Sequence, residues 1–91
     1  MPASYRFVVT GRVQGVGFRA ATRRKALTLG LHGWVRNRND GAVEGLVCGD
    51  DRRIKEFREW LGKGPPIAQV SRLEWSAAGS EESNGDFVVL R

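Results

Sequence analysis

The sequence predicts an α+β domain in which two helices lie on one face of a mostly antiparallel sheet. Segments with strand and helix patterns follow one another in the order β-α-β-β-α-β, with a short final strand. This order is typical of the split βαβ, ferredoxin-like arrangement. A length of 91 residues is enough for one compact core. We therefore expect a single domain over residues 1–91, complete in itself and without a linker or internal repeat.

The first part of the domain is predicted to be a strand, a glycine-rich loop and a helix. Residues 5–10 are rich in aromatic and β-branched side chains, which favour a strand. After the loop, a helix is expected from residue 18 to a stop at Gly30, since glycine is common just past a helix C-terminus. The small or apolar residues of this helix recur at steps of three and four, on one face: Phe18, Thr22, Ala26 and Leu29.

A β-hairpin is expected next. Strands are predicted over residues 31–38 and 42–49, joined by the turn Asn39-Asp40-Gly41. Asp-Gly is a strong hairpin signal because both of its residues suit positive φ values.

The last part of the domain is predicted to hold a second helix and two strands. Asp50 or Asp51 is suited to cap the helix, and Gly62, Gly64 and two prolines end it. A strand over residues 68–77, a polar loop over 79–85 and a short strand over 86–91 complete the chain. The apolar stripe of the helix comprises Ile54, Phe57, Trp60 and Leu61.

Composition narrows the classes of protein. The net charge of +5 favours anionic partners.

No apolar run approaches the roughly 20 residues of a membrane-spanning helix, and the first residues carry no apolar signal core, so we expect a cytoplasmic protein. A single cysteine, Cys48, allows no intrachain disulfide and fits a reducing compartment. One cysteine and one histidine are too few for a zinc site of the usual type, so we expect no metal and no cofactor.

The most informative segment is residues 11–19, Gly-Arg-Val-Gln-Gly-Val-Gly-Phe-Arg. Its three glycines let the backbone turn sharply and bring successive N–H groups round to one point. Arg12 and Arg19 flank this loop, and the helix that starts there adds the positive end of its dipole. The segment therefore predicts a cradle for a small anion, and we expect that anion to be a phosphoryl group.

Together with two later segments, this loop resembles the acylphosphatases. Gly33-Trp-Val-Arg-Asn37 and Gly41-Ala-Val-Glu-Gly45 follow at the spacing of that family, and the resemblance extends from Tyr5 to the end of the chain. It implies hydrolysis of carboxyl-phosphate anhydrides without metal or cofactor, with a small-molecule acyl phosphate as substrate and inorganic phosphate as product.

The resemblance also implies roles for individual residues. Arg19 matches the arginine that pairs with the phosphate oxygens, and Asn37 matches the asparagine that holds the attacking water. Arg38 stands where the family often has a small hydroxylic residue, a difference that bears on turn contacts or substrate preference. Backbone N–H groups of the loop are implied to surround the phosphate, from Arg12, Val13, Gln14, Gly15, Val16, Gly17 and Phe18.

The chemistry of the residue types agrees with these roles. An acyl phosphate already has a good leaving group, so catalysis needs a water in line and stabilisation of charge on the phosphoryl oxygens. The fork of Arg19 can bind two oxygens at once. The amide of Asn37 is a weak base, so its expected role is to orient water and not to remove its proton.

The main alternative is a binding module of the same fold, for RNA on the sheet or for phosphorylated ligands without turnover. RNA-binding domains share the element order, but their third strand presents stacking aromatics. Here residues 42–49 contain no aromatic side chain, which counts against nucleic acid. Both Arg19 and Asn37 are present, which counts against binding without turnover. A monomer is the simplest expectation.

Other candidate motifs have structural explanations. Residues 15–20 match the dinucleotide pattern G-x-G-x-x-A only weakly, and no G-K-[ST] follows the glycines. Cys48 and His32 have no partners at the spacing of a catalytic site, so we expect packing or surface roles for both. The three tryptophans are expected to be core or half-buried residues: Trp34, Trp60 and Trp75.

Overall fold

The protein is described from a computed structural model, which covers residues 2–79 and 85–90. The element order confirms the predicted β-α-β-β-α-β plan with a short last strand. Residues 80–84 of the predicted polar loop and the end of the predicted final strand, residue 91, lie outside the described residues. The elements are β1 (Pro2–Arg12), α1 (Phe18–Thr28), β2 (His32–Asn37), β3 (Val43–Asp50), α2 (Asp51–Leu61), β4 (Gln69–Ala77) and β5 (Phe87–Val89).

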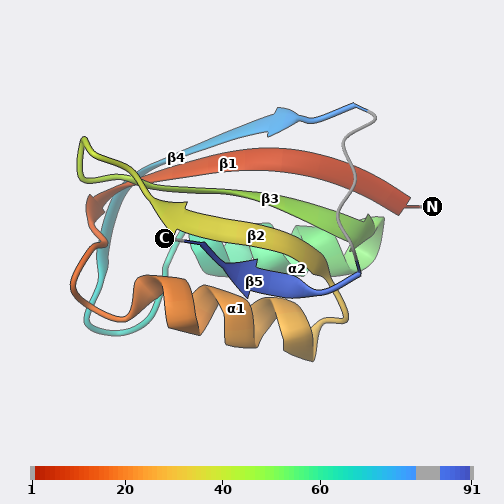
Figure 1. The fold of residues 1–91 in the computed structure, drawn as a ribbon, viewed down its shortest axis with the longest axis horizontal. Coiled ribbons are helices and arrows are strands. Elements are labelled where there is room, and N and C mark those ends of the chain that lie inside the picture. Colours follow the sequence, from red (N-terminus) through yellow and green to blue (C-terminus); the bar gives the residue numbers. More distant parts are fainter. Residues whose placement is uncertain (1, 80–84, 91) are drawn as a thin grey trace.

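The strands form one sheet in the order β4-β1-β3-β2-β5. The pairings β4–β1, β1–β3 and β3–β2 are antiparallel, whereas β5 pairs with β2 in parallel. Both helices lie on one side of this sheet, as Figure 1 shows. The end of β1, the start of α1 and the β2–β3 hairpin meet at one end of the molecule (Figure 1).

Strand β1 is longer than the predicted 5–10 because it has a partner on each side. Its pairing with β3 begins at Pro2, opposite Asp50, and its pairing with β4 continues to Arg12, opposite Gln69. The extra pairs satisfy backbone groups that a loop would leave to solvent. As a result, the glycine loop starts from a strand that is held up to its last residue.

The core lies between the sheet and the helices. Phe7 and Val9, which are alternate residues of β1, face the helices and are at most 1% exposed. The Phe57 ring of α2 lies 5.7 Å from the Phe7 ring and 6.1 Å from the Phe87 ring, centroid to centroid. These aromatic contacts pack α2 against β1 and β5 of the sheet.

Both helices have the predicted faces and ends. The predicted face of α1 is buried along its whole length, and the N–H groups of Gly30 and Leu31 bond back to Leu27 and Ala26. In α2 the Asp50 carboxylate accepts the Arg52 N–H at 2.8 Å, so Asp50 is the capping residue. That bond holds the pKa of Asp50 below its usual value. Within residues 2–79 and 85–90, no helix is long and apolar enough to cross a membrane.

The hairpin turn differs from the prediction in one respect. Gly41 has a φ of 94°, but no described residue other than glycine has a positive φ, so the expectation for Asp40 was wrong. The turn is a three-residue one, in which the Gly41 N–H bonds to the Arg38 carbonyl at 3.3 Å and the Arg38 N–H bonds to the Ala42 carbonyl at 2.8 Å. A three-residue loop of this kind needs only its last residue in the left-handed region.

Candidate functional site

The glycine loop has the geometry of an anion-binding turn. Gly15 and Gly17 have φ values of 75° and 76°, while Val16 between them does not have a positive φ. Alternation of left- and right-handed residues turns successive N–H groups toward the same side of the chain. A Cβ at either glycine would meet no atom within 4 Å, so their requirement is for backbone conformation and not for close packing.

The N-terminus of α1 completes this concave surface. Its N-cap is Gly17, no side chain caps it, and its first turn contains no acidic residue. The first N–H groups of a helix have no partner within the helix, and the dipole makes this end positive. Helix α2 differs, because Asp50 occupies the equivalent position there. The uncapped end of α1 therefore presents free donors beside the loop.

Arg19 lies in the first turn of α1 and is half-buried. Its Nη1 donates to the Leu90 carbonyl, just beyond β5, at 3.2 Å. One turn later, the Arg23 Nε donates to the Phe87 carbonyl at 3.0 Å. These two bonds attach the C-terminal segment to α1 and restrict the orientation of the Arg19 guanidinium. No sequence pattern indicated this contact, because it joins positions 71 residues apart.

Asn37 is the last residue of β2 and lies on the helix side of the sheet. Asn37 is two residues after Val35, so both side chains leave the strand on the same face, and Val35 is fully buried in the core. Its Oδ1 atom is buried and has no hydrogen-bond partner among the described residues. A buried acceptor without a partner is unfavourable, and in native proteins it calls for an explanation, of which a functional role is one.

Gln14 joins the loop to the hairpin that carries Asn37. Its Nε2 donates to the Arg38 carbonyl at 2.8 Å and to the Ala42 carbonyl at 2.9 Å. Both acceptors belong to the turn that directly follows β2. The family resemblance implied only a backbone role for Gln14, whereas the tertiary structure adds these side-chain bonds. They attach the glycine loop to the hairpin turn next to Asn37.

The other predicted loop residues divide by exposure. Val13 and Phe18 are 1% exposed, so their side chains anchor the loop in the core and leave only their backbone for an anion. Val16 is half-buried against the same core. Arg12 is exposed at the end of β1. The loop is thus a polar backbone turn fixed by apolar side chains.

Arg38 makes turn contacts. Its Nη2 lies 2.7 Å from the Asp40 carboxylate, and its Nη1 lies 3.8 Å from Glu44. Asp40 also accepts the Ala42 N–H at 3.1 Å. That backbone bond, aided by Arg38, holds the pKa of Asp40 below its usual value.

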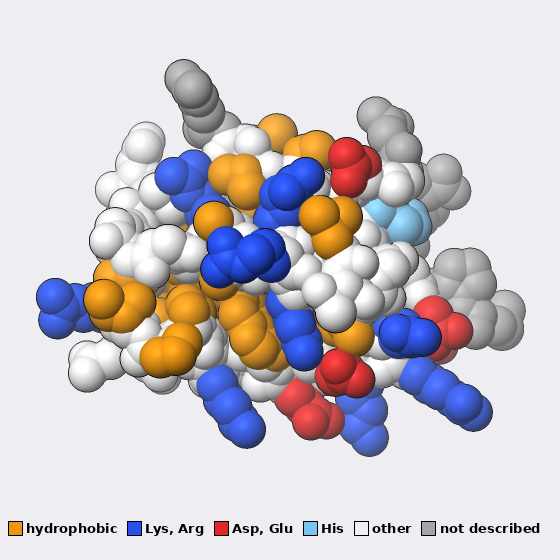
Figure 2. Space-filling view, turned by 90° about the horizontal axis from the view of Figure 1, so that it is seen from below, with side chains coloured by type: hydrophobic (Ala, Val, Ile, Leu, Met, Phe, Trp, Pro, Cys, Tyr) orange, Lys and Arg blue, Asp and Glu red, His pale blue; other side chains and the backbone are white. Residues whose placement is uncertain are grey.

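Basic side chains are scattered over the helix side of the surface and do not form one patch. Figure 2 shows Lys and Arg side chains interspersed with hydrophobic and acidic ones across this face. Arg23 and Arg24 are exposed there, and Lys25 pairs with Glu56 at 3.4 Å. This pattern is typical of a solvated helical face and does not single out a macromolecular partner.

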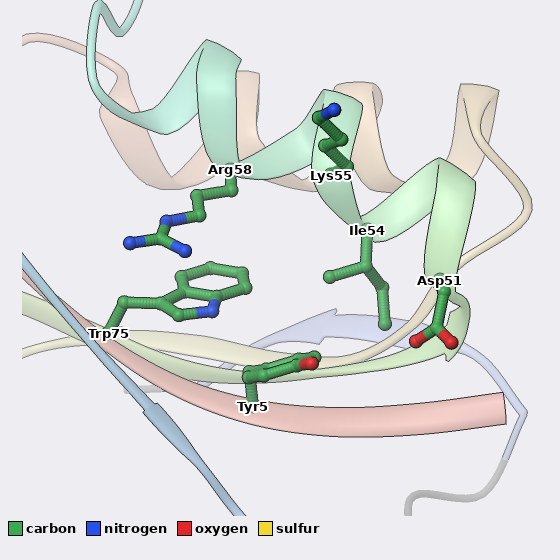
Figure 3. A pocket seen from close by; sticks show the side chains of 6 residues that line it. All are labelled: Tyr5, Asp51, Ile54, Lys55, Arg58 and Trp75. Carbon is green, nitrogen blue, oxygen red and sulfur yellow. The ribbon is translucent and has the colours of Figure 1, made fainter.

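A separate hollow lies between α2 and the β1–β4 edge (Figure 3). The Arg58 guanidinium lies 5.2 Å from the centroid of Trp75, and the rings of Tyr5 and Trp75 stack at 5.0 Å. Tyr5 is seven residues from Arg12, about 23 Å along an extended strand. None of the predicted site residues lines this hollow, and the contact of Arg58 with Trp75 joins α2 to β4 across it.

The expected structural residues are also placed. Cys48 is 4% exposed and accepts a hydrogen bond from the Ser4 hydroxyl at 3.2 Å, which fits a packing role. All three tryptophans are half-buried: Trp34, Trp60 and Trp75.

Comparison with known proteins identifies relatives of similar sequence and structure. The family model described as Acylphosphatase matches residues 5–89. An acylphosphatase of an Azoarcus species is 49% identical over 77 residues, which cover 85% of this chain and 79% of that protein. An acylphosphatase structure from Coxiella burnetii has a TM-score of 0.92 at 42% identity, covering 98% of this chain and 93% of that one. One from Bacillus subtilis has a TM-score of 0.93 at 37% identity and covers both chains fully. The span matched by the family model includes every predicted site residue.

Proposed function

This chain belongs to the acylphosphatase family, and we propose that it hydrolyses the carboxyl-phosphate bond of acyl phosphates to a carboxylate and inorganic phosphate. The observation that carries this proposal is the buried, unpartnered Oδ1 of Asn37, on a hairpin that Gln14 attaches to an N–H-lined loop. An anion cradle and an unpaired acceptor, held together, are what positioning a water against a phosphoryl group requires.

The phosphoryl group binds through the loop and Arg19. Backbone N–H groups from residue 12 to residue 18 and the free donors of the α1 N-terminus surround the phosphoryl oxygens. The Arg19 guanidinium pairs with two of these oxygens and stabilises the charge that they carry in the transition state. Its bond to the Leu90 carbonyl leaves further N–H donors of the guanidinium for the substrate.

Asn37 orients the attacking water. Its Oδ1 accepts one hydrogen of the water, which directs an oxygen lone pair at phosphorus. The water then forms a bond to phosphorus as the bond from phosphorus to the acyl oxygen breaks, and both hydrogens of the water remain on the product, which leaves as dihydrogen phosphate. Because phosphoryl transfer of this kind depends on positioning and electrostatics, no strong general base is required.

The leaving group needs no acid catalyst. It departs as a carboxylate, and the conjugate acid of a carboxylate has a pKa of about 4, so it is stable at neutral pH. The described site contains no buried carboxylic acid that would donate a proton.

We also propose the wider setting of this activity. Residues 1–91 form one acylphosphatase-like domain that acts as a monomer, which is supported by the origin of all the site residues in one chain. A cytoplasmic location is supported by the single, buried cysteine, which suits a reducing compartment.

Release of inorganic phosphate from benzoyl phosphate and acetyl phosphate, measured with a chelator present, tests the proposal. We expect turnover with both substrates, and competitive inhibition by inorganic phosphate that weakens as salt is added. A protein that binds phosphate but releases none from either substrate would contradict hydrolysis and favour a binding module.

A further inference from the structure

We infer that Glu44 is a positioning residue for Asn37, because its carboxylate holds both of the arginines that flank that asparagine. This inference rests on the proposed water-positioning role of Asn37. Glu44 lies in β3 directly opposite Arg36, one residue before the end of β2. Arg38 is the first residue after β2. Glu44 therefore contacts the chain on each side of Asn37.

The two carboxylate oxygens divide between the two arginines. The Arg36 Nε lies 2.6 Å from Oε2 of Glu44, and the Arg38 Nη1 lies 3.8 Å from Oε1. The Glu44 side chain is only 18% exposed, whereas the acids of the other described ion pairs are 52–59% exposed. Shielding from water strengthens such contacts relative to exposed ones.

An ion pair and a hydrogen bond stabilise the turn that follows Asn37 in the chain. Arg38 also pairs with Asp40 at 2.7 Å, and Asp40 accepts the Ala42 N–H at 3.1 Å. The Arg36 guanidinium lies 5.0 Å from the centroid of the Trp34 ring. We call Arg36, Arg38, Asp40 and Glu44 the hairpin ion cluster.

The orientation of the Asn37 amide depends on the hairpin ion cluster. Its Oδ1 has no hydrogen-bond partner among the described residues, so no contact of that oxygen fixes the direction of the amide. The direction is set by the backbone from which the side chain leaves, and the hairpin ion cluster restrains that backbone on both sides. Small displacements of a positioning group reduce turnover strongly.

The cluster acts on the water and not on the phosphate. Arg36 and Glu44 form a cross-strand pair on the face of the sheet opposite to Asn37, since neighbouring residues of a strand point to opposite faces. The glycine loop and α1 lie on the other face (Figure 1). Loss of the Glu44 charge leaves two arginines less neutralised near the site, which raises the positive potential there. We therefore expect the variant Glu44→Gln to turn over slowly while it binds phosphate at least as tightly as the native protein.

The test compares Glu44→Gln with Glu74→Gln. Glu74 is a matched control, because it pairs with Arg72 at 3.7 Å on β4, which β1 and β3 separate from β2. Both changes remove one negative charge. We expect kcat of Glu44→Gln to fall roughly tenfold, the scale of a modest misplacement, with the inhibition constant of phosphate equal or lower. Glu74→Gln should keep native kcat.

A second variant separates positioning from general destabilisation. Arg38→Gln breaks the same cluster from the other side, and the double variant with Glu44→Gln should turn over no more slowly than the slower single variant. Native kcat in folded Glu44→Gln, or an equal fall in Glu74→Gln, overturns the inference. So does a fall in kcat accompanied by equally weakened phosphate binding. If the native protein itself hydrolyses no acyl phosphate, the proposed function fails first, and the inference fails with it.

Discussion

The sharpest test of the proposed site is Asn37→Ala, because the structure predicts opposite effects on turnover and stability. The Asn37 Oδ1 is buried without a hydrogen-bond partner among the described residues. An unpaired buried acceptor destabilises a fold by about 1–3 kcal/mol. Truncation to alanine removes that penalty but gives up side-chain packing and strand propensity, together about 1 kcal/mol. We expect the free energy of unfolding to rise by about 1 kcal/mol.

Turnover should change in the other direction. In the proposed mechanism Asn37 contacts the attacking water and hardly touches the substrate, so its loss should be expressed in the transition state. We expect kcat to fall at least about a hundredfold, which corresponds to roughly 3 kcal/mol of the activation barrier. The affinity for inorganic phosphate should change little, since the loop and Arg19 are intact.

The assay joins three measurements on one preparation. Steady-state hydrolysis of benzoyl phosphate gives kcat, phosphate inhibition gives affinity, and thermal unfolding followed by circular dichroism gives stability. A gain of about 1 kcal/mol raises Tm by about 4–8 °C in a domain of this size. Asn39→Ala is the control, because Asn39 is exposed in the adjacent turn and should keep native kcat.

Two results would refute this reasoning. Turnover close to native in folded Asn37→Ala would remove the water-positioning role. A large loss of stability would show that the amide oxygen has a structural partner and that its unpaired state is not a functional feature.

Three further predictions concern other parts of the molecule. Arg19→Gln should weaken phosphate binding and also reduce kcat heavily, because in the proposed mechanism Arg19 contacts the phosphoryl oxygens in both ground and transition states; native phosphate affinity in the folded variant would contradict the anion cradle. Cys48→Ser should keep most of kcat and lose about 1 kcal/mol of stability by placing a hydroxyl in a packed strand. Cys48 pairs with His32, at the opposite end of β2 from Asn37, so rapid inactivation of the native enzyme by thiol alkylation would be unexpected. The pKa of Asp50 is lowered by the Arg52 N–H, so its carboxylate stabilises the fold above the pKa of the unfolded chain, and this stabilisation is lost as the pH falls through the lower folded value; acid titrations of Tm should show a shallower decline below about pH 4 for Asp50→Asn than for the native protein.

The sequence was sufficient for the element order and for the ends of most elements. Periodic apolar residues and local stop signals act within a few positions, so the buried face of α1 and its end at Gly30 could be derived from neighbours alone. The turn at residues 39–41 was placed correctly for the same reason. Its conformation was not, because a two-residue and a three-residue turn share the Asp40-Gly41 signal and the pairing of β2 with β3 selects between them.

The glycine loop by itself predicted an anion cradle, and the resemblance to the acylphosphatases indicated which further residues to consider for the site. Arg19, Asn37 and the glycines are of residue types that suit phosphoryl transfer, and the family match covers all of them. The sequence could not show how these residues are held, since hydrogen bonds between distant segments have no local pattern. The tertiary structure alone decided three sets of contacts. These are the Gln14 bonds to the hairpin, the Arg19 bond to the Leu90 carbonyl, and the ion pairs of Glu44 with Arg36 and Arg38. The physical reason for this difference is that local backbone conformation follows largely from neighbours along the chain. The orientation of a side chain depends instead on the strands and helices that the fold brings beside it.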